Sequence, residues 1–77
     1  MKYSVIFEPR ARKDLRALQP EIWERILSKI ALLEDNLSGD VKHLTNFTPE
    51  YRLCVGDWRV LFELAGSEIV IYRILHR

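Results

Sequence analysis

The chain has one cysteine, Cys54, among its 77 residues, and it has no long apolar run. A single cysteine cannot form a disulfide within the chain, and it excludes a zinc site built from cysteines. The longest unbroken apolar stretches, such as residues 69–72, are far shorter than the roughly 20 residues that cross a bilayer. The apolar run at residues 3–7 is too short for a secretory signal. These absences predict a cytoplasmic protein with no membrane partner.

Excess charge is also missing, because 12 basic and 11 acidic residues leave a net charge of +1. Proteins that bind nucleic acid are commonly basic, since each phosphate contact uses a cation and releases counterions. An RNA-binding function must therefore come from where the cations lie rather than from how many there are. With 48% hydrophobic and 30% charged residues, the composition is that of a globular chain. The length predicts one small domain over residues 1–77, burying roughly 60% of the surface of its unfolded chain.

Two helices are predicted in the first half of the chain, after a strand at residues 3–7. Pro9 suits a helix start, and apolar residues at helical spacing predict a helix over residues 9–18. Pro20 starts a second helix that extends to about Asn36. The apolar surplus of this second helix is consistent with a bound partner protein. Its main apolar row is Ile22, Ile26, Ile30 and Leu33, and the row is widened by Trp23, Leu27 and Ala31.

The last third of the chain is predicted to form three antiparallel strands. Residues 41–49 are predicted as a loop, and alternating apolar residues then mark strands at residues 51–55, 58–64 and 69–75. The turns between them are short, which makes the strands antiparallel neighbours. The order β-α-α-β-β-β predicts an α+β fold, in which an N-terminal helix hairpin packs on one face of a small, mainly antiparallel four-stranded sheet.

The alternation also separates the side chains of the strands into two faces. If Val60 and its apolar neighbours face the helices, Arg59 and Glu63 point to the open face. Arg52, on the preceding strand, then joins Arg59 there, and the two arginines form a local cationic site despite the nearly neutral total. Arg73 and Arg77 add cations near the end of the last strand. The residues predicted to point inward are Tyr51, Leu53, Val55, Trp58, Val60, Phe62 and Leu64.

Three segments, in this order of elements, carry a characteristic combination of residues. Residues 51–63 read YRLCVGDWRVLFE, residues 69–77 read IVIYRILHR, and the opening YSVIF at residues 3–7 is followed by Ala11 and by KDL at residues 13–15. Together they resemble the RelE/ParE superfamily of toxins of bacterial and archaeal type II toxin–antitoxin systems, which act in translation inhibition or plasmid stabilisation. The resemblance covers nearly the whole chain.

The resemblance is strongest to RelE-like members, and it implies a ribosome-dependent mRNA interferase. Such a protein is a metal-independent endoribonuclease that cleaves mRNA in the ribosomal A site and inhibits translation. By position, the resemblance implies that Arg59 contacts the scissile phosphate and that Arg52 and Arg77 are the accompanying basic residues. It implies that His76 acts as an acid or base. We expect Arg52 to bind RNA together with two further cations, Arg73 and Lys42.

The chemistry of RNA cleavage tests these assignments. Arginine suits the phosphate because its planar fork stays charged and binds two oxygens at once, but it is a poor proton carrier. A base for the 2′-hydroxyl and an acid for the 5′-oxygen must come from elsewhere. Only His43 and His76 titrate near neutral pH without perturbation, and Glu50 is a further candidate base. The mechanistic hypothesis is that Arg59 and Arg52 clamp the phosphate, His76 transfers a proton and Arg77 assists.

Simpler interpretations accompany these assignments. Arg59 can instead form an ion pair with Glu63 on the same face. His43 is interpreted as a polar residue on the surface of a loop. Trp23 and Trp58 fall on apolar rows, so they read as core residues rather than as platforms for bases. Cys54 shares a face with the arginines, where an unactivated thiol is inert.

Two rival functions stay open. A ParE-like poison of DNA gyrase acts through binding alone, and it is favoured by the low net charge and by Cys54, which replaces a basic residue of some RelE proteins. A degenerate toxin would bind its antitoxin and co-regulate the operon. It is favoured by the absence, after Arg77, of the tyrosine that many relatives carry.

The resemblance also implies partners for the chain. The first is a RelB-like antitoxin that wraps the toxin along its helix hairpin and open sheet face. The ribosome and mRNA are the targets, and the toxin–antitoxin complex is expected to bind operator DNA. No cofactor or metal is implied.

Overall fold

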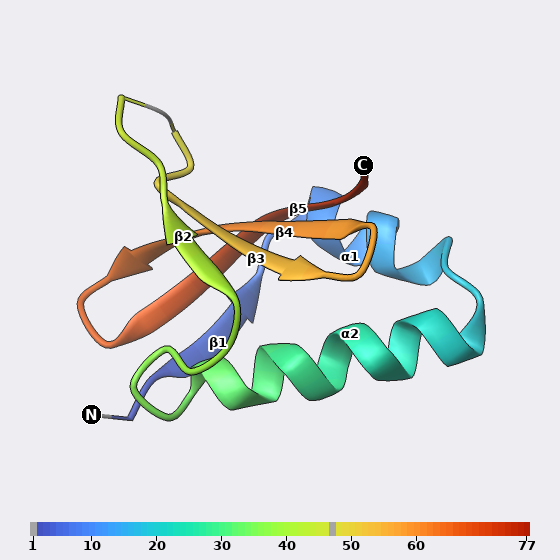
Figure 1. Ribbon diagram of the computed structural model, residues 1–77, viewed down its shortest axis with the longest axis horizontal. Coiled ribbons are helices and arrows are strands. Elements are labelled where there is room, and N and C mark those ends of the chain that lie inside the picture. Colours follow the sequence, from blue (N-terminus) through green and yellow to red (C-terminus); the bar gives the residue numbers. More distant parts are fainter. Residues whose placement is uncertain (1, 47) are drawn as a thin grey trace.

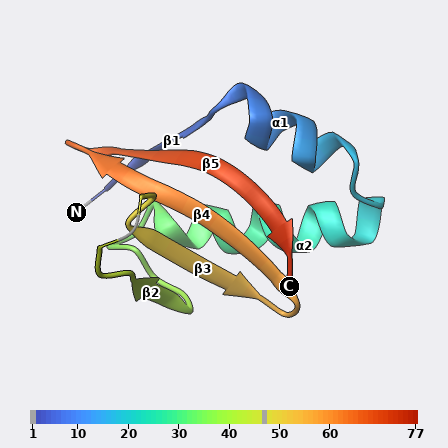
Figure 2. The ribbon, with the colours of Figure 1, turned by 90° about the horizontal axis from the view of Figure 1, so that it is seen from above.

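The computed structural model describes residues 2–46 and 48–77. The helix at Pro20–Leu33 lies beneath a single sheet, and the helix at Pro9–Arg16 lies along one side of it (Figures 1 and 2). The opposite sheet face, which points upward in Figure 1 and toward the reader in Figure 2, is not covered by either helix, and we call it the open face. The elements are β1 (Ser4–Phe7), α1 (Pro9–Arg16), α2 (Pro20–Leu33), β2 (Val41–His43), β3 (Tyr51–Val55), β4 (Trp58–Ala65) and β5 (Glu68–His76).

The sheet has five strands in the order β1-β5-β4-β3-β2. β1 runs parallel to β5, and the other neighbours are antiparallel. The predicted α+β class is confirmed, whereas the predicted count of four strands is wrong. Within the predicted loop, Val41–His43 forms a strand that pairs with β3, with Val41 opposite Leu53. Three residues are too few to show an alternating pattern, so only pairing with β3 reveals this strand.

Both helices end earlier than their apolar spacing predicts. α1 ends at Arg16, two residues before the predicted end, and α2 ends at Leu33 rather than near Asn36. Asn36 and Leu37 each have a φ of 56°, in the left-handed region that terminates a helix. In the described part of the chain, neither helix has the length and apolarity that a membrane span requires.

The core lies between the two helices and the covered sheet face. The predicted alternation is confirmed there, because Leu53, Val55, Val60 and Phe62 are all buried. Trp58 packs against the core from a half-buried position, but Trp23 is 40% exposed, so its interpretation as a core residue is wrong. The buried set is Ala11, Ile26, Ile30 and Leu33 from the helices, with Leu53, Val55, Val60, Phe62, Ile69, Ile71 and Ile74 from the strands.

A bulge in β5 changes the phase of its alternation. Phe62 of β4 pairs with Ile71, whereas Leu61 pairs with Arg73, which leaves Tyr72 without a partner on β4. An extra residue of this kind shifts every later side chain to the other face. As a result Ile71 and Ile74 are both buried although they are three positions apart, and Arg73 shares a row with Leu61.

Candidate functional site

The strand register aligns three of the candidate RNA-binding residues across the open face. Lys42 of β2 lies opposite Arg52 of β3, Arg52 lies opposite Leu61 of β4, and Leu61 lies opposite Arg73 of β5. From β2 to β5 this row consists of Lys42, Arg52, Leu61 and Arg73, and we call it the cationic row after its three basic members. Like charges directly opposite each other destabilise a sheet, so Lys42 and Arg52 are an unfavourable pair unless an anion binds between them.

Arg52 is also the residue with the clearest unused hydrogen-bonding capacity. Its side chain is half-buried, and the Nε atom is buried with no hydrogen-bond partner among the described residues. A buried donor without an acceptor costs free energy, roughly 1–3 kcal/mol. Among the described residues, no ion pair neutralises the charge of Arg52.

Arg59 lies in the next row of the open face, opposite Cys54 of β3 and Leu75 of β5. Its Nη1 donates to the carbonyl oxygens of Gly56 and Trp58, at 2.9 and 3.0 Å. These bonds hold the guanidinium against its own hairpin turn and leave its Nε and Nη2 groups for another acceptor. The alternative pairing with Glu63 is wrong, because the guanidinium is bonded to the turn and no ion pair joins these two described residues.

Three arginines meet at the turn between β3 and β4. Arg59 donates to Gly56, and Arg77 lies beside Asp57, with its backbone N–H 2.7 Å from the Asp57 carbonyl oxygen and its Nη1 3.8 Å from Asp57 Oδ1. The third is Arg25 of α2, whose Nη2 would lie 2.8 Å from a Cβ atom added to Gly56. Arg59 and Arg77 thus both lie at this turn, each through its own contact with it. Arg25 was missed, because nothing in its own helix marks it as a neighbour of a turn thirty residues later.

His76 is not on the same face as Arg59. His76 pairs with Trp58, whereas the next residue of β4, Arg59, pairs with Leu75. Successive residues of a strand point to opposite faces, so the side chain of His76 points to the covered face. Its ring meets the Trp58 ring edge-on, with centroids 4.8 Å apart and an angle of 78°. Because Trp58 packs against the core, His76 lies at the exposed margin of the covered face.

Glu63 and Tyr72 are titratable groups that the sequence did not single out as proton carriers. Glu63 alternates with the buried Phe62, which places it on the open face. The pKa of Tyr72 is raised, chiefly by the negative charge of Glu63 and further by Glu8. The bulge at Tyr72 determines this neighbourhood, and no local pattern in the sequence signals it.

Arg73 has a structural partner in α1. Its Nε and Nη2 donate to Asp14 Oδ2 and Oδ1, at 2.8 and 3.2 Å, and the backbone N–H of Ile74 also donates to Oδ2, at 3.0 Å. This guanidinium holds the pKa of Asp14 below its usual value. The Asp14 side chain is 18% exposed, so the pair is only partly screened by water. Arg73 therefore joins α1 to the sheet, with part of its fork already occupied.

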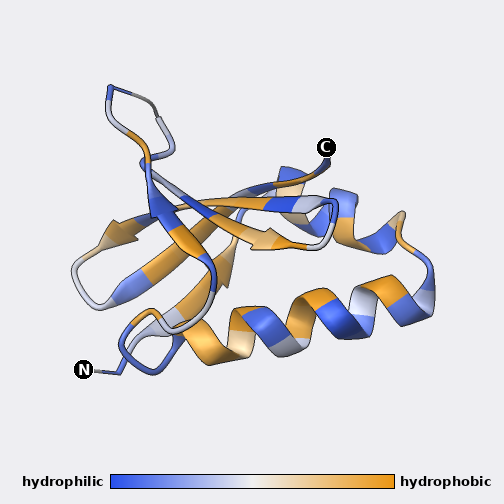
Figure 3. Ribbon diagram, viewed as in Figure 1, coloured by the Kyte–Doolittle hydropathy of each residue, from blue (hydrophilic) through white to orange (hydrophobic). Residues whose placement is uncertain are grey.

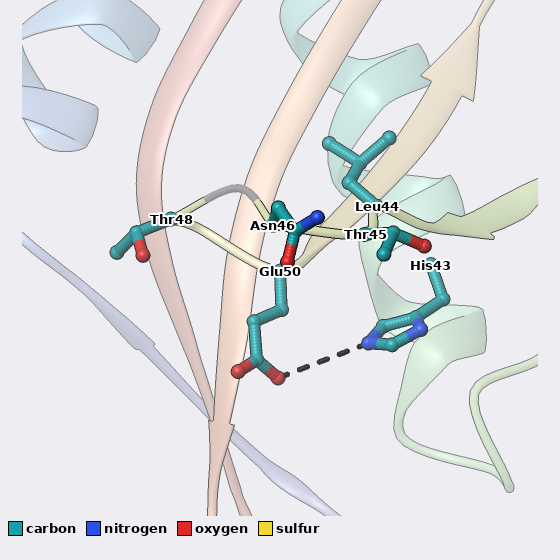
Figure 4. A pocket seen from close by; sticks show the side chains of 6 residues that line it. All are labelled: His43, Leu44, Thr45, Asn46, Thr48 and Glu50. Atoms are coloured by element: carbon teal, nitrogen blue, oxygen red, sulfur yellow. Dashed lines mark ion pairs between the residues drawn. The ribbon is translucent and has the colours of Figure 1, made fainter.

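His43 and Glu50 lie at the other end of β3, beside the loop that follows β2 (Figure 4). His43 Nε2 is 3.9 Å from Glu50 Oε2, and the His43 ring contacts Tyr51, with centroids 4.9 Å apart. A shallow pocket is lined by both residues and by the loop. Because His43 pairs with Tyr51, it belongs to the covered-face rows and is separated from Arg59 by the length of β3. Within residues 2–46 and 48–77, no group of three or more acidic, His or Cys side chains is placed to hold a metal ion.

The chain is similar to known toxins over nearly its whole length. A family model described as the ParE toxin of type II toxin–antitoxin systems matches residues 5–77. The toxin RelE3 of Methanocaldococcus jannaschii is 31% identical over 80 residues, covering 95% of this chain and 89% of that protein.

Chains in solved toxin–antitoxin complexes share the fold. The RelB–RelE antitoxin–toxin complex of Methanococcus jannaschii contains a chain that aligns with a TM-score of 0.78 at 30% identity, covering 94% of this chain and 89% of that one. The RelBE2 toxin–antitoxin complex of Mycobacterium tuberculosis contains a chain that aligns with a TM-score of 0.84 at 26% identity, covering 100% of both chains.

Proposed function

The chain belongs to the RelE/ParE superfamily of toxins of type II toxin–antitoxin systems, and from this membership we propose that it is a ribosome-dependent mRNA endonuclease. It would cleave mRNA in the ribosomal A site and thereby stop translation. The open face is the proposed contact surface for the mRNA backbone.

The observation that carries the proposal is the arrangement of cations on the open face. Lys42 and Arg52 are directly opposed, and Arg52 has a buried donor without a partner. Arg59 is held by its hairpin turn with donors to spare. A phosphate would relieve the opposed charges and accept from the remaining Arg59 donors, and fixed donors are the kind that stabilise negative charge developing in a transition state.

We assign the phosphate clamp to Arg52 and Arg59, with Arg77 assisting from the turn. Cleavage also needs a base that takes the 2′-hydroxyl proton and an acid that protonates the departing 5′-oxygen. The family resemblance assigns proton transfer to His76, whereas the open face offers Glu63 and Tyr72. Comparing His76→Ala with Tyr72→Phe decides between the two assignments. The substitution that removes the pH dependence of cleavage identifies the proton carrier.

The direct test is to map mRNA 5′ ends by primer extension in an in vitro translation reaction with the purified chain. New ends at A-site codons are expected, and Arg59→Ala should reduce their rate on the order of 100-fold. Because Arg59 also holds a turn, Arg59→Lys serves as a second variant that keeps the charge and loses the fork. Lys29→Ala, at an exposed position of α2, is the matched control and should cleave like the parent chain.

A second candidate function is poisoning of DNA gyrase. It is favoured by the match to a family model named for ParE, and by the apolar neighbours of the cations on the open face, Cys54, Leu61 and Leu75. Intact mRNA together with loss of supercoiling in a gyrase assay would establish this function instead. Failure of both assays would leave a degenerate toxin that acts through its antitoxin and operator.

We also propose a RelB-like antitoxin as the partner, because the aligned chains from Methanococcus jannaschii and Mycobacterium tuberculosis come from toxin–antitoxin complexes. The chain offers exposed apolar side chains for such a partner: Trp23 and Leu32 of α2 are 40% and 47% exposed, and Ile6 of β1 is 40% exposed. Trp23→Glu should weaken antitoxin binding in calorimetric titration without lowering mRNA cleavage. Equal affinity for the parent chain and the variant would remove α2 from the proposed interface.

A further inference from the structure

Apart from Pro9, every exposed residue of α1 is a cation. Arg10, Arg12, Lys13 and Arg16 are all exposed, whereas Ala11 is fully buried and Leu15 packs against the core. Figure 3 shows this helix as mainly hydrophilic, in contrast to the alternating colours of α2. No large exposed apolar side chain lies on α1, since those of the described residues are Ile6, Trp23 and Leu32.

Charge is therefore concentrated on one element of a nearly neutral protein. Four basic residues and one acidic residue give α1 a net charge of +3, while the whole chain carries +1, so the rest carries −2. The one acid of α1, Asp14, is bound by Arg73 and by the N–H of Ile74. Its carboxylate points to β5 and does not interrupt the cationic surface.

This surface continues the open face. Arg73 ends the cationic row on β5, and its guanidinium reaches α1 through Asp14. Arg10, Lys13, Asp14, Ala17 and Arg73 line a cleft between the helix and the strand. Positive charge thus runs from Lys42, across the sheet, to the outer side of α1.

We propose that α1 is a second RNA-binding surface, which holds the phosphate backbone of ribosomal RNA while the open face engages the mRNA. This inference rests on the proposed function and adds the surface that would position the toxin on the ribosome. RNA fits the surface better than a membrane, because an amphipathic helix at a lipid interface must expose apolar side chains, and Ala11 and Leu15 of α1 pack into or against the core. Arginine and lysine on a rigid helix suit phosphate contacts that are independent of sequence.

The test uses a double variant, Arg12→Gln and Arg16→Gln, because glutamine keeps a high helix propensity. The matched control, Lys2→Gln and Lys29→Gln, removes the same charge from exposed positions outside α1 and the open face. Binding to purified ribosomes and to a short labelled RNA duplex is measured by sedimentation and fluorescence anisotropy over a series of salt concentrations.

The α1 variant should bind ribosomes on the order of tenfold more weakly, and the slope of log affinity against log salt should fall by about 1.5, since each of two phosphate contacts contributes roughly 0.7–0.9. The control variant should keep the parent slope. Equal losses in both variants, or tighter binding of the parent chain to a DNA duplex than to the RNA duplex, would overturn the inference.

An mRNA cleavage assay distinguishes a failure of this inference from a failure of the proposed function. At saturating ribosome concentration the α1 variant should cleave mRNA at the parent rate, because Arg52 and Arg59 are unchanged. A parent chain that binds ribosomes through α1 but never cleaves would contradict the proposed function alone. A parent chain that cleaves with no effect of the α1 substitutions on affinity would contradict only the α1 surface.

Discussion

The two faces of the sheet use the same strands for opposite purposes. On the covered face, Leu53, Val60 and Phe62 are buried against the helices and supply the stability of the fold. On the open face, Lys42 lies opposite Arg52, and a buried donor of Arg52 lacks an acceptor, which costs stability. The comparison supports our proposal that the open face binds a ligand. Substitutions on the two faces should therefore have effects of opposite kind.

The largest effect is expected on the covered face, from Phe62→Ala. Phe62 is fully buried, and the cavity left by its ring should lower the free energy of unfolding by about 3–5 kcal/mol. Urea denaturation measures the change. Leu61→Ala, one residue earlier on the open face, is the control and should cost less than half as much. A similar loss from both would mean that the two faces do not differ in their contribution to stability.

The next effect concerns the edge of β5, where α1 joins the sheet. Asp14→Asn removes the charge that binds Arg73 and should lower the free energy of unfolding by about 1–3 kcal/mol at neutral pH. The pKa of Asp14 is lowered in the folded state, so its contribution is present above the unfolded value of about 4 and is lost as the pH falls through the folded value. Chemical denaturation from pH 7 to pH 2 should show the parent and variant curves converging below about pH 4. Curves that stay parallel over that range would show that ionisation of Asp14 contributes nothing to the free energy of unfolding.

A smaller effect is expected at the turn that holds Arg59. Gly56 has a φ of 59°, and an added Cβ would meet the guanidinium of Arg25, so Gly56→Ala should cost roughly 1–2 kcal/mol and also slow mRNA cleavage. Gly66→Ala is the matched control, because Gly66 has a φ of 63° with open space around it. Both variants should lose similar stability in thermal unfolding, and only Gly56→Ala should lose activity. Loss of activity in both would place the effect in backbone strain rather than in the arginine cluster.

The smallest effect tests the comparison most directly, because this substitution should raise the free energy of unfolding rather than lower it. Lys42→Gln removes one of two opposed cations and should raise the free energy of unfolding by about 0.2–1 kcal/mol while weakening RNA binding. The gain should shrink at high salt, since exposed charges are then screened. Lys29→Gln, on α2, should change neither property. A loss of stability in the Lys42 variant would contradict the interpretation of the open face as an unrelieved cationic surface.

The sequence by itself determined the class of the fold and the content of each face. Alternation with a period of two is a local property, so the buried positions of Leu53, Val60 and Phe62 could be predicted, and Arg52 and Arg59 follow on the other face. Helix starts at Pro9 and Pro20 were predictable for the same reason, because proline suits the first turn of a helix whatever surrounds it.

Only the tertiary structure decided which of these groups meet. The pairing of Val41–His43 with β3, the bulge at Tyr72 and the contact of Arg73 with Asp14 depend on residues far apart in the chain. The same holds for His76, whose face depends on the phase of a strand that the bulge resets. Local periodicity determines which way a side chain points within its own element, but register, bulges and helix packing determine which other side chain it reaches.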